Sequence, residues 1–400
     1  MVNVDMDKVH QVVADAIKAH SAELEDLSLQ IHSKPELAFE EHFAHDLLTT
    51  YLQGQGFIVT KNACCLKTAF IAEYTPEKHH DKELLTIAFL SEYDALPVIG
   101  HACGHNLIAI VGIAAALGFK AAMDEFKIPA RLRVYGTPAE EAAGGKINMI
   151  DYGAFKDVDV ALMGHGGNKS IVYCNALAMQ TIHVHYYGIS AHGAAAPWEG
   201  INALDAIVTA YTSISNLRQQ TLPTNRIHGV IHEGGAAPNV IPNYTRGEWY
   251  IRAKYRDDLE ALRPRVLACF EAGAKATGCT YKVEIEEPFY DIKANDALCQ
   301  MYTKYAEREG VVMSSKEVQL ASLLGSTDMG NVTYVVPGIH PIFDIGCTSN
   351  IHTESFREHA KTPEAHEAAL KCSRILSMTA LECIADPVAL ANVRKDFGNK

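Results

Sequence analysis

The chain has 400 residues, of which 48% are apolar and 21% are charged, and its formal net charge is −13. The negative charge argues against nucleic acid or an anionic membrane as a partner. The length exceeds one typical hydrophobic core and predicts two domains. Ten cysteines are spread along the chain without a dense framework, which favours a reducing compartment. Because we recognise neither a signal peptide nor a membrane-spanning run, we expect a cytoplasmic protein.

The chain begins with the patterns of helices and short strands. Apolar residues spaced by three and four predict a helix over residues 9–32, and a second helix is predicted over 38–52. Short apolar stretches at 57–60 and 68–74 predict strands. These elements precede the stretch around which we expect the rest of the chain to be organised.

Residues 84–106 read LLTIAFLSEYDALPVIGHACGHN. The apolar start predicts a strand buried on both faces, and a loop leads from it to an alanine-rich helix over 107–123. The loop carries Cys103 and His105, whose thiolate and imidazole are zinc ligands, and it lies at the strand end where open α/β sheets bind ligands. The alternative is a packed cysteine and a histidine that caps the helix. The short C-x-H motif alone favours that alternative.

Two further strand and helix pairs follow. A strand predicted at 131–135 leads into Glu140 and Glu141, and a strand predicted at 158–163 leads into His165. The carboxyl ends of parallel strands in βαβ units lie at one edge of a sheet. We therefore expect these side chains to lie beside the metal-binding loop, although they are far from it in the sequence.

The pattern changes in the middle of the chain. The order strand-helix-strand-strand-helix-strand over 179–289 is that of a ferredoxin-like unit. We predict that 179–289 form an inserted lid or dimerisation domain, and that 1–178 and 290–400 form a catalytic α/β domain. Its sheet is expected to be mixed, largely parallel and flanked by helices. Near its end, His352 follows a strand predicted at 341–345.

The predicted strand ends supply one sulfur, three imidazole nitrogens and one carboxylate oxygen. These donors belong to Cys103, His105, His165, His352 and one of the pair Glu140 and Glu141. Taken singly, each histidine is more often structural than a ligand, so the argument depends on the set. Mg²⁺ and Ca²⁺ prefer oxygen ligands, and this set therefore indicates two borderline ions such as Zn²⁺. Of the adjacent carboxylates, one would ligate and the other would take a proton from water.

Seven stretches together resemble the dinuclear zinc metallopeptidases and amidohydrolases related to aminoacylase-1 and carboxypeptidase G (metallopeptidase family M20). Within that family they are similar to the branch that contains aminobenzoyl-glutamate hydrolase and β-alanyl-lysine dipeptidase. The resemblance spans nearly the whole chain. It is carried by SEYDALP at 91–97, GHACGHN at 100–106, TPAEEAAGGK at 137–146, GISAHGAAAPWEGINALDA at 188–206, GGAAPNVIP at 234–242, GSTDMGNVTYVVPGIHP at 325–341 and NIHTESF at 350–356.

The resemblance implies how the donors are divided between two ions. Cys103 would bridge both ions, at a position that is aspartate in carboxypeptidase G-like members. Glu141 and His352 would complete one ion. His105 and His165 would complete the other.

The resemblance also implies roles for other residues. Glu140 would be the general base, and Asp94 would be an acid that orients a metal ligand. His192, on the inserted domain, would reach the site of a partner subunit and stabilise the oxyanion. Asn239 and Arg252 would bind substrate, with the Arg252 guanidinium facing a carboxylate.

The chain departs from the family pattern at two places. Asn106 stands where the wider amidohydrolase branch has aspartate, which removes the acid at that position. Residues 91–94, Ser-Glu-Tyr-Asp, lack the histidine of the His-x-Asp motif of the broader family. His105 must then supply that nitrogen.

The predicted function is metal-dependent hydrolysis of an amide between a small acyl or aminoacyl group and an amino acid with a free carboxylate. The predicted cofactors are two divalent ions, Zn²⁺ first, with Mn²⁺ or Co²⁺ as alternatives. The predicted partners are a dipeptide or N-acyl amino acid and a second copy of the chain in a homodimer. Three alternatives stay open: a metal-free cysteine hydrolase that uses Cys103, a non-catalytic binding protein, and a biosynthetic relative that makes or trims an amide.

Overall fold

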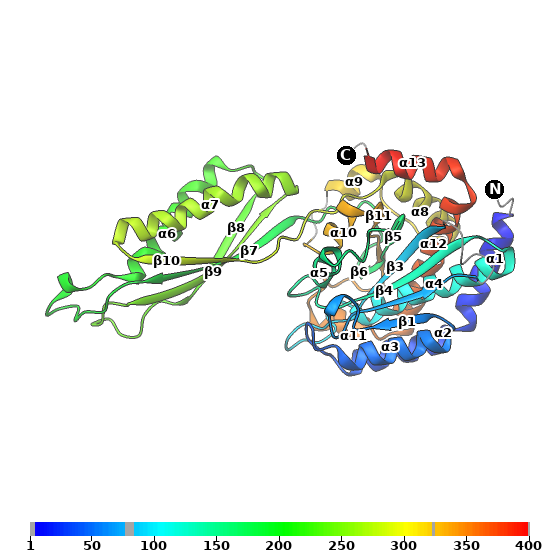
Figure 1. Cartoon of the computed structure of the whole chain (residues 1–400), viewed down its shortest axis with the longest axis horizontal. Coiled ribbons are helices and arrows are strands. Elements are labelled where there is room, and N and C mark those ends of the chain that lie inside the picture. The colour runs from blue at the N-terminus through cyan, green and yellow to red at the C-terminus, as the bar shows by residue number, and fades with distance from the viewer. Residues whose placement is uncertain (1–4, 77–83, 322–324, 399–400) are drawn as a thin grey trace. The chain divides into compact units, whose positions relative to one another are not determined.

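The chain forms two compact units in a computed structural model. The structure describes residues 5–76, 84–321 and 325–398. The first unit comprises Met1–Asn175 and Ile292–Lys400, and the second comprises Ala176–Asp291. The blue N-terminal helices and the red C-terminal helices belong to the same unit (Figure 1). The first unit is therefore assembled from both ends of the chain, and the second from its middle.

The first unit is built on a six-stranded sheet with the order β1-β2-β4-β3-β5-β11. Neighbours among β4, β3, β5 and β11 are parallel, whereas β1 and β2 extend the sheet antiparallel. Strands β6 and β12 form a separate parallel pair. The strands are β1 (Ile58–Lys61), β2 (Phe70–Tyr74), β3 (Leu85–Glu92), β4 (Ala130–Thr137), β5 (Val160–Leu162), β6 (His165–Gly167), β11 (Gly338–Ile339) and β12 (Ile342–Asp344).

Helices cover both faces of this sheet. One face packs against α1, α2, α3, α4, α8 and α12, and the other packs against α5 and α10. Because β3 is covered on both faces, every residue of the strand after Leu85 is buried, which accounts for its nearly uninterrupted apolar run. The helices of the unit are α1 (Met6–Ala19), α2 (Ser21–Ser33), α3 (His42–Gly54), α4 (His105–Phe126), α5 (Gly145–Asp151), α8 (Asp296–Arg308), α9 (Lys316–Ala321), α10 (Met329–Val335), α11 (Glu354–His359), α12 (Pro363–Ala385) and α13 (Pro387–Gly398).

Helix α4 connects the core to the predicted metal-binding loop, because His105 is its first residue. The helix is long and apolar enough to cross a membrane, and 89% of its most apolar stretch is buried inside the structure. Gly104 precedes it with φ +79°, and a Cβ atom at this position would lie 3.1 Å from the ring of Phe356. Only glycine adopts this positive φ and leaves room for the Phe356 ring without strain.

The predicted helix over 9–32 is wrong in one respect, because the structure contains two helices. Helix α1 ends at Ala19, and α2 begins at Ser21. His20 lies between them with φ −97° and ψ 3°, and its Nδ1 atom lies 3.0 Å from a carboxylate oxygen of Glu23. The apolar spacing continues through this break, so periodicity could not reveal it.

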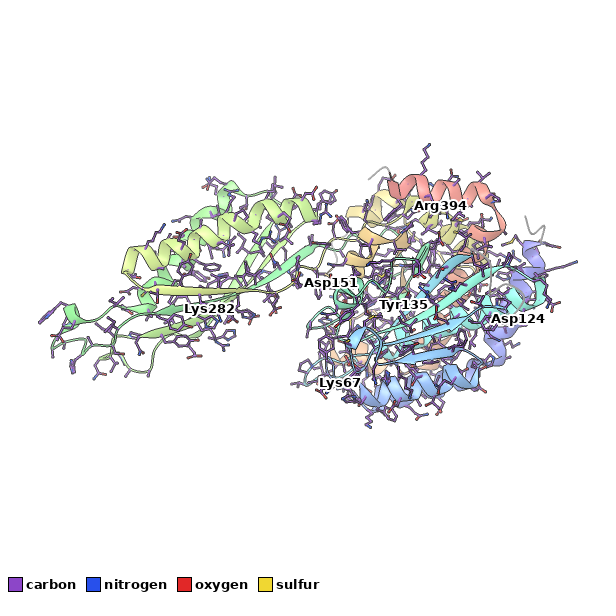
Figure 2. All side chains as sticks on the ribbon, viewed as in Figure 1. Lys67, Asp124, Tyr135, Asp151, Lys282 and Arg394 are labelled. Carbon is purple, nitrogen blue, oxygen red and sulfur yellow. The ribbon has the colours of Figure 1, made fainter. Side chains whose placement is uncertain are left out.

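The second unit is a four-stranded antiparallel sheet with two helices on one face. Its strand order is β10-β7-β9-β8, as in a ferredoxin-like unit. Trp249 of β9 packs against Phe270 of α7. Figure 2 shows Lys282 on β10 of this unit and Tyr135 within the first unit. The elements are β7 (Ala178–Tyr187), α6 (Ala203–Leu217), β8 (Arg226–Glu233), β9 (Tyr244–Ala253), α7 (Arg256–Thr277) and β10 (Thr280–Ile285). The predicted fold class is confirmed.

Candidate metal centre

The parallel strands of the first unit bring distant loops together at one edge. The last residues of β3 and β4, Glu92 and Thr137, are direct partners in the sheet register. The chain after β3 carries Cys103, and the chain after β4 carries Glu141. His165 begins the short strand β6, whereas the sequence predicts a loop there. Pairing of β6 with β12 fixes the backbone at this histidine.

Five predicted donors form two overlapping groups, in each of which the donor atoms lie within 4.8 Å of one another. The groups are Cys103, His105 and His165, and Cys103, Glu141 and His352. The Cys103 Sγ atom lies 3.5 Å from His165 Nε2, and His352 Nε2 lies 3.5 Å from Glu141 Oε1. Metal–ligand bonds of about 2.0–2.3 Å in a tetrahedron separate neighbouring ligand atoms by about 3.3–3.6 Å. The structure thus brings all five side chains to spacings that suit two ions with a shared sulfur.

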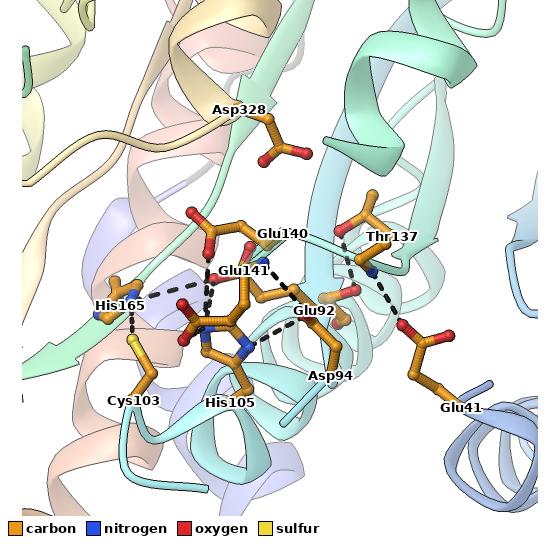
Figure 3. A network of polar contacts seen from close by, with 12 residues as sticks. Glu41, Glu92, Asp94, Cys103, His105, Thr137, Glu140, Glu141, His165 and Asp328 are labelled. Atoms are coloured by element: carbon orange, nitrogen blue, oxygen red, sulfur yellow. Dashed lines mark hydrogen bonds and ion pairs between the residues drawn. The ribbon is translucent and has the colours of Figure 1, made fainter. Parts of the chain in front are cut away.

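Asp94 lies behind two of these donors (Figure 3). One of its oxygens lies 3.1 Å from His105 Nδ1, and the other accepts the backbone N–H of Glu141 at 2.9 Å. On the opposite side, His165 Nδ1 donates to the carbonyl oxygen of Gly166 at 2.6 Å. These bonds occupy one nitrogen of each histidine and leave Nε2 facing the other donors, as is usual for histidines that ligate metals.

The turn before Glu140 is held in a strained conformation. Ala139 has φ +61°, which is uncommon for a residue with a Cβ atom. A carboxylate oxygen of Glu41 accepts the backbone N–H of Ala139 at 2.9 Å, and its other oxygen accepts the Thr68 hydroxyl at 2.7 Å. Further along, a Cβ atom on Gly145 would lie 2.0 Å from a backbone oxygen. Glu41 and this close approach together fix the direction in which the two adjacent carboxylates point.

The two adjacent carboxylates differ in electrostatic environment. Burial and the negative charges of Glu92 and Glu141 raise the pKa of Glu140 well above its ordinary value. Burial also opposes ionisation of Glu141, but the neighbouring imidazoles of His352 and His105 outweigh it and lower the pKa. A raised pKa suits a proton acceptor that works near neutral pH, and a lowered pKa suits a metal ligand.

The electrostatics of Cys103 disfavour the metal-free alternative. In the protein without ions, burial and the charge of Glu141 raise the pKa of the Cys103 thiol well above its ordinary value. A neutral thiol is a poor nucleophile. Burial lowers the pKa of His165, which keeps its imidazole neutral, the form that binds metals.

The donor set fits divalent cations. Three buried atoms that face the cluster have no hydrogen-bond partner among the described residues: Glu92 Oε1, His105 Nε2 and Glu141 Oε1. Burial of polar atoms without partners is costly. The carboxylates in the cluster also outnumber the ammonium of Lys146. Cations bound among these atoms would give the three atoms partners and would balance the excess negative charge.

Three predicted residues lie on the second unit rather than on the first. The exposed His192 accepts the N–H groups of Ala194 and Ala195 at its Nδ1 atom, at 3.2 and 3.1 Å. Asn239 is also exposed and lies beside it, because its carbonyl accepts the N–H of the residue that follows His192. Arg252 is half-buried on β9. Their predicted roles in catalysis and substrate binding stay predictions.

Sequence reasoning missed a buried charge network beside the donors. Lys146 Nζ lies 2.6 Å from Glu92 Oε2 and 2.6 Å from Asp328 Oδ1, and all three side chains are completely buried. One signal in the sequence could have revealed it. Glu92 is an acidic residue at the end of an apolar strand, where the resembled family has a histidine. Asn106, the other departure, donates to Ser28 Oγ and to the carbonyl of Ala360, and so connects α4 to its neighbours.

A cluster of sulfur, imidazole and carboxylate groups with a further carboxylate beside it is the arrangement that a metal-dependent hydrolase requires. The family model described as Peptidase family M20/M25/M40 matches residues 88–378. The chain belongs to this family, and the predicted recognition and enzyme class are confirmed. The alternative of a non-catalytic binding protein has no support.

The sequence relatives extend over almost the whole chain. It is 44% identical to a mouse protein named Xaa-Arg dipeptidase, over 98% of this chain and 93% of the relative. The human protein of that name is 43% identical, over 96% of this chain and 91% of the human protein. One of the subunits of p-aminobenzoyl-glutamate hydrolase from Escherichia coli is 26% identical, over 98% of this chain and 95% of that subunit.

Solved structures confirm the fold. A putative aminohydrolase from Staphylococcus aureus aligns with a TM-score of 0.74 and 16% identity, over 93% of this chain and 99% of that one. A dinuclear metal-binding peptidase of the M20 family from Bacillus subtilis aligns with a TM-score of 0.66 and 19% identity, over 91% of this chain and 99% of that peptidase.

Proposed function

We propose that the chain hydrolyses the amide of a dipeptide or N-acyl amino acid whose amino-acid part has a free carboxylate. The convergence of five metal donors beside the carboxylate of Glu140 carries the proposal. Relatives more than 40% identical over nearly the full length are named Xaa-Arg dipeptidases. Dipeptides that end in arginine are therefore the first substrates to test, followed by β-alanyl dipeptides.

The chemistry combines bound cations with the side chains of the first unit. Two divalent ions, when bound, polarise the carbonyl of the amide and lower the pKa of water. We propose Zn²⁺, because one sulfur and three imidazoles suit a borderline ion. Glu140 takes the proton of the attacking water and delivers it to the nitrogen of the leaving amine as the C–N bond breaks. Asp94 keeps His105 and Glu141 in place during this transfer.

The second unit contributes substrate contacts and the oxyanion partner in this proposal. The chain acts as a homodimer, in which His192 serves the active site of the partner subunit and stabilises the negative oxygen. Arg252 and Asn239 bind the substrate, with Arg252 facing its carboxylate, and the unit closes over it as a lid. The support is the resemblance of residues 188–206 and 234–242 to the corresponding family motifs.

Chelation tests the metal requirement. The purified protein is treated with a chelator, dialysed, and reloaded with Zn²⁺, Mn²⁺ or Co²⁺, and release of free amine from arginine-terminated and β-alanyl dipeptides is measured. We expect no turnover without ions and recovery with at least one of them. Full turnover after complete removal of metal would instead support a cysteine hydrolase. Net amide formation under the same conditions would support the biosynthetic alternative.

We also propose that the protein works in the cytoplasm. All ten cysteines are free thiols, which supports a reducing compartment. Fractionation of the source cells tests this, and recovery of the protein outside the cytosolic fraction would contradict it.

A further inference from the structure

Glu92 faces the donor cluster from the end of β3. Its side chain is completely buried, and its Oε2 atom lies 2.6 Å from Lys146 Nζ. Its other oxygen, Oε1, has no hydrogen-bond partner among the described residues. That oxygen lies 3.4 Å from His105 Nε2 and 4.0 Å from His165 Nε2. A buried carboxylate oxygen that has no hydrogen-bond partner and lies beside two imidazole nitrogens needs an explanation.

The spacing of Oε1 is that of a metal ligand. Carboxylate oxygens and imidazole nitrogens bind Zn²⁺ at about 2.0–2.2 Å, which separates two such ligand atoms on one ion by about 3.3–3.6 Å. The distance from Glu92 Oε1 to His105 Nε2 falls within this range. Its longer distance to His165 Nε2 fits a second ligand of the same ion after a small adjustment.

The network behind Glu92 fixes its orientation. The ammonium of Lys146 bridges Glu92 and Asp328 at 2.6 Å each, and Asp328 also accepts the backbone N–H of Lys146 at 2.9 Å. Both oxygens of Asp328 are used within this network. Hydrogen-bonded neighbours of this kind hold metal ligands in place.

We propose that Glu92 Oε1 is a fourth protein ligand of the ion held by Cys103, His105 and His165, and that the two ions are therefore unequal. This inference rests on the proposed two-metal function and deepens it. The ion near Glu92 has four protein ligands, which is the arrangement of closed sites, whereas the other ion has three and keeps a position open for substrate.

Exposure points to the same asymmetry. The side chains of Glu92 and His105 are completely buried, whereas that of His352 is 47% exposed. The four-ligand ion is enclosed, and the three-ligand ion lies toward solvent. We infer that the enclosed ion exchanges slowly and that the exposed ion exchanges fast.

Metal-release kinetics test this inference without measuring activity. Protein loaded with two Zn²⁺ per chain is mixed with excess chromophoric chelator, and ion release is followed by absorbance. The wild type should release one ion in a fast phase and one in a slow phase. Glu92→Gln should accelerate the slow phase by about 10–100-fold and leave the fast phase unchanged.

Asp328→Asn is the matched control, because it removes the other carboxylate partner of Lys146 but no oxygen aimed at the histidines. It should accelerate the slow phase clearly less than Glu92→Gln does, because Glu92 Oε1 stays in place and Lys146 keeps one carboxylate partner. If Glu92→Gln does not fold, Glu92→Asp serves instead, because it keeps a negative charge near Lys146 while it withdraws the oxygen from the ion. That variant should also accelerate the slow phase.

Two results would overturn the inference. One is an unchanged slow phase in the Glu92 variants while the wild type binds two ions, and the other is equal acceleration in the Glu92 and Asp328 variants, which would reveal a purely structural network. A wild type that binds no ions under any loading condition would instead overturn the two-metal function itself.

Discussion

The two units present their candidate functional residues in opposite ways. In the first unit, His105 and Glu140 are buried and lie among identifiable partners. In the second unit, His192 and Asn239 are exposed, and their contacts are to local backbone. A buried polar atom must find a partner or lose free energy, so its surroundings reveal its role within one chain. An exposed side chain carries no such constraint, and its role must be found by experiment.

The largest expected effect is a loss of turnover when Glu140 is replaced, which tests the role assigned to a buried residue of the first unit. Glu140→Gln keeps the shape of the side chain but cannot accept a proton, so turnover should fall by about 10²–10⁴-fold. Metal content, measured by atomic emission, should stay at the wild-type level. Glu125→Gln, at an exposed position on α4, is the control and should retain wild-type turnover. Near-normal turnover in Glu140→Gln would remove Glu140 from the role of base.

The next effect concerns stability. Lys146→Met leaves the buried charges of Glu92 and Asp328 without their shared cation, which should lower the free energy of unfolding by about 3–5 kcal/mol. Lys120→Met is the control, because Lys120 pairs with Asp124 near the surface and should cost less than about 1 kcal/mol. Urea unfolding measures both. Equal stability of the two variants would show that the network does not depend on its lysine.

A substitution of His192 tests the role proposed for an exposed residue of the second unit. His192→Ala should lower turnover by about 10²–10³-fold if it stabilises the oxyanion. Mixed with Glu140→Gln chains, it should recover up to about a quarter of wild-type activity, because half of the reassorted dimers then carry one intact site. His232→Ala, on β8 of the same unit, is the control for folding. No recovery after verified subunit exchange would argue against a site shared between chains.

The smallest effect is a pH dependence at Glu41. Burial raises the pKa of Glu41 from 4.5 to about 7, so the folded protein retains a proton that the unfolded chain loses. Stability should therefore fall as pH rises from about 4.5 to 7, by about 3 kcal/mol. Glu41→Gln cannot titrate and should flatten this slope in urea unfolding of the metal-free protein, whereas Glu40→Gln at an exposed position should not. Identical slopes in both variants would contradict the assignment.

The sequence was sufficient to predict that the five candidate donors lie close together, because each follows an apolar strand. Cys103 and Glu141 were found from that pattern, together with the resemblance that divided their roles. The network of Glu92, Lys146 and Asp328 was missed, because its pairs are 54 and 182 residues apart and have no periodic signal. The break at His20 was missed for the opposite reason, since the periodic signal continues through it.

Assembly of the first unit from both ends of the chain affects its synthesis. The donors extend from Cys103 to His352, so the centre cannot form until most of the polypeptide has left the ribosome. The second unit, Ala176–Asp291, is contiguous and can fold as soon as it emerges. During that interval the emerged part of the first unit has neither α12 nor His352, so the apolar face of α4 that later packs against α12 is still uncovered.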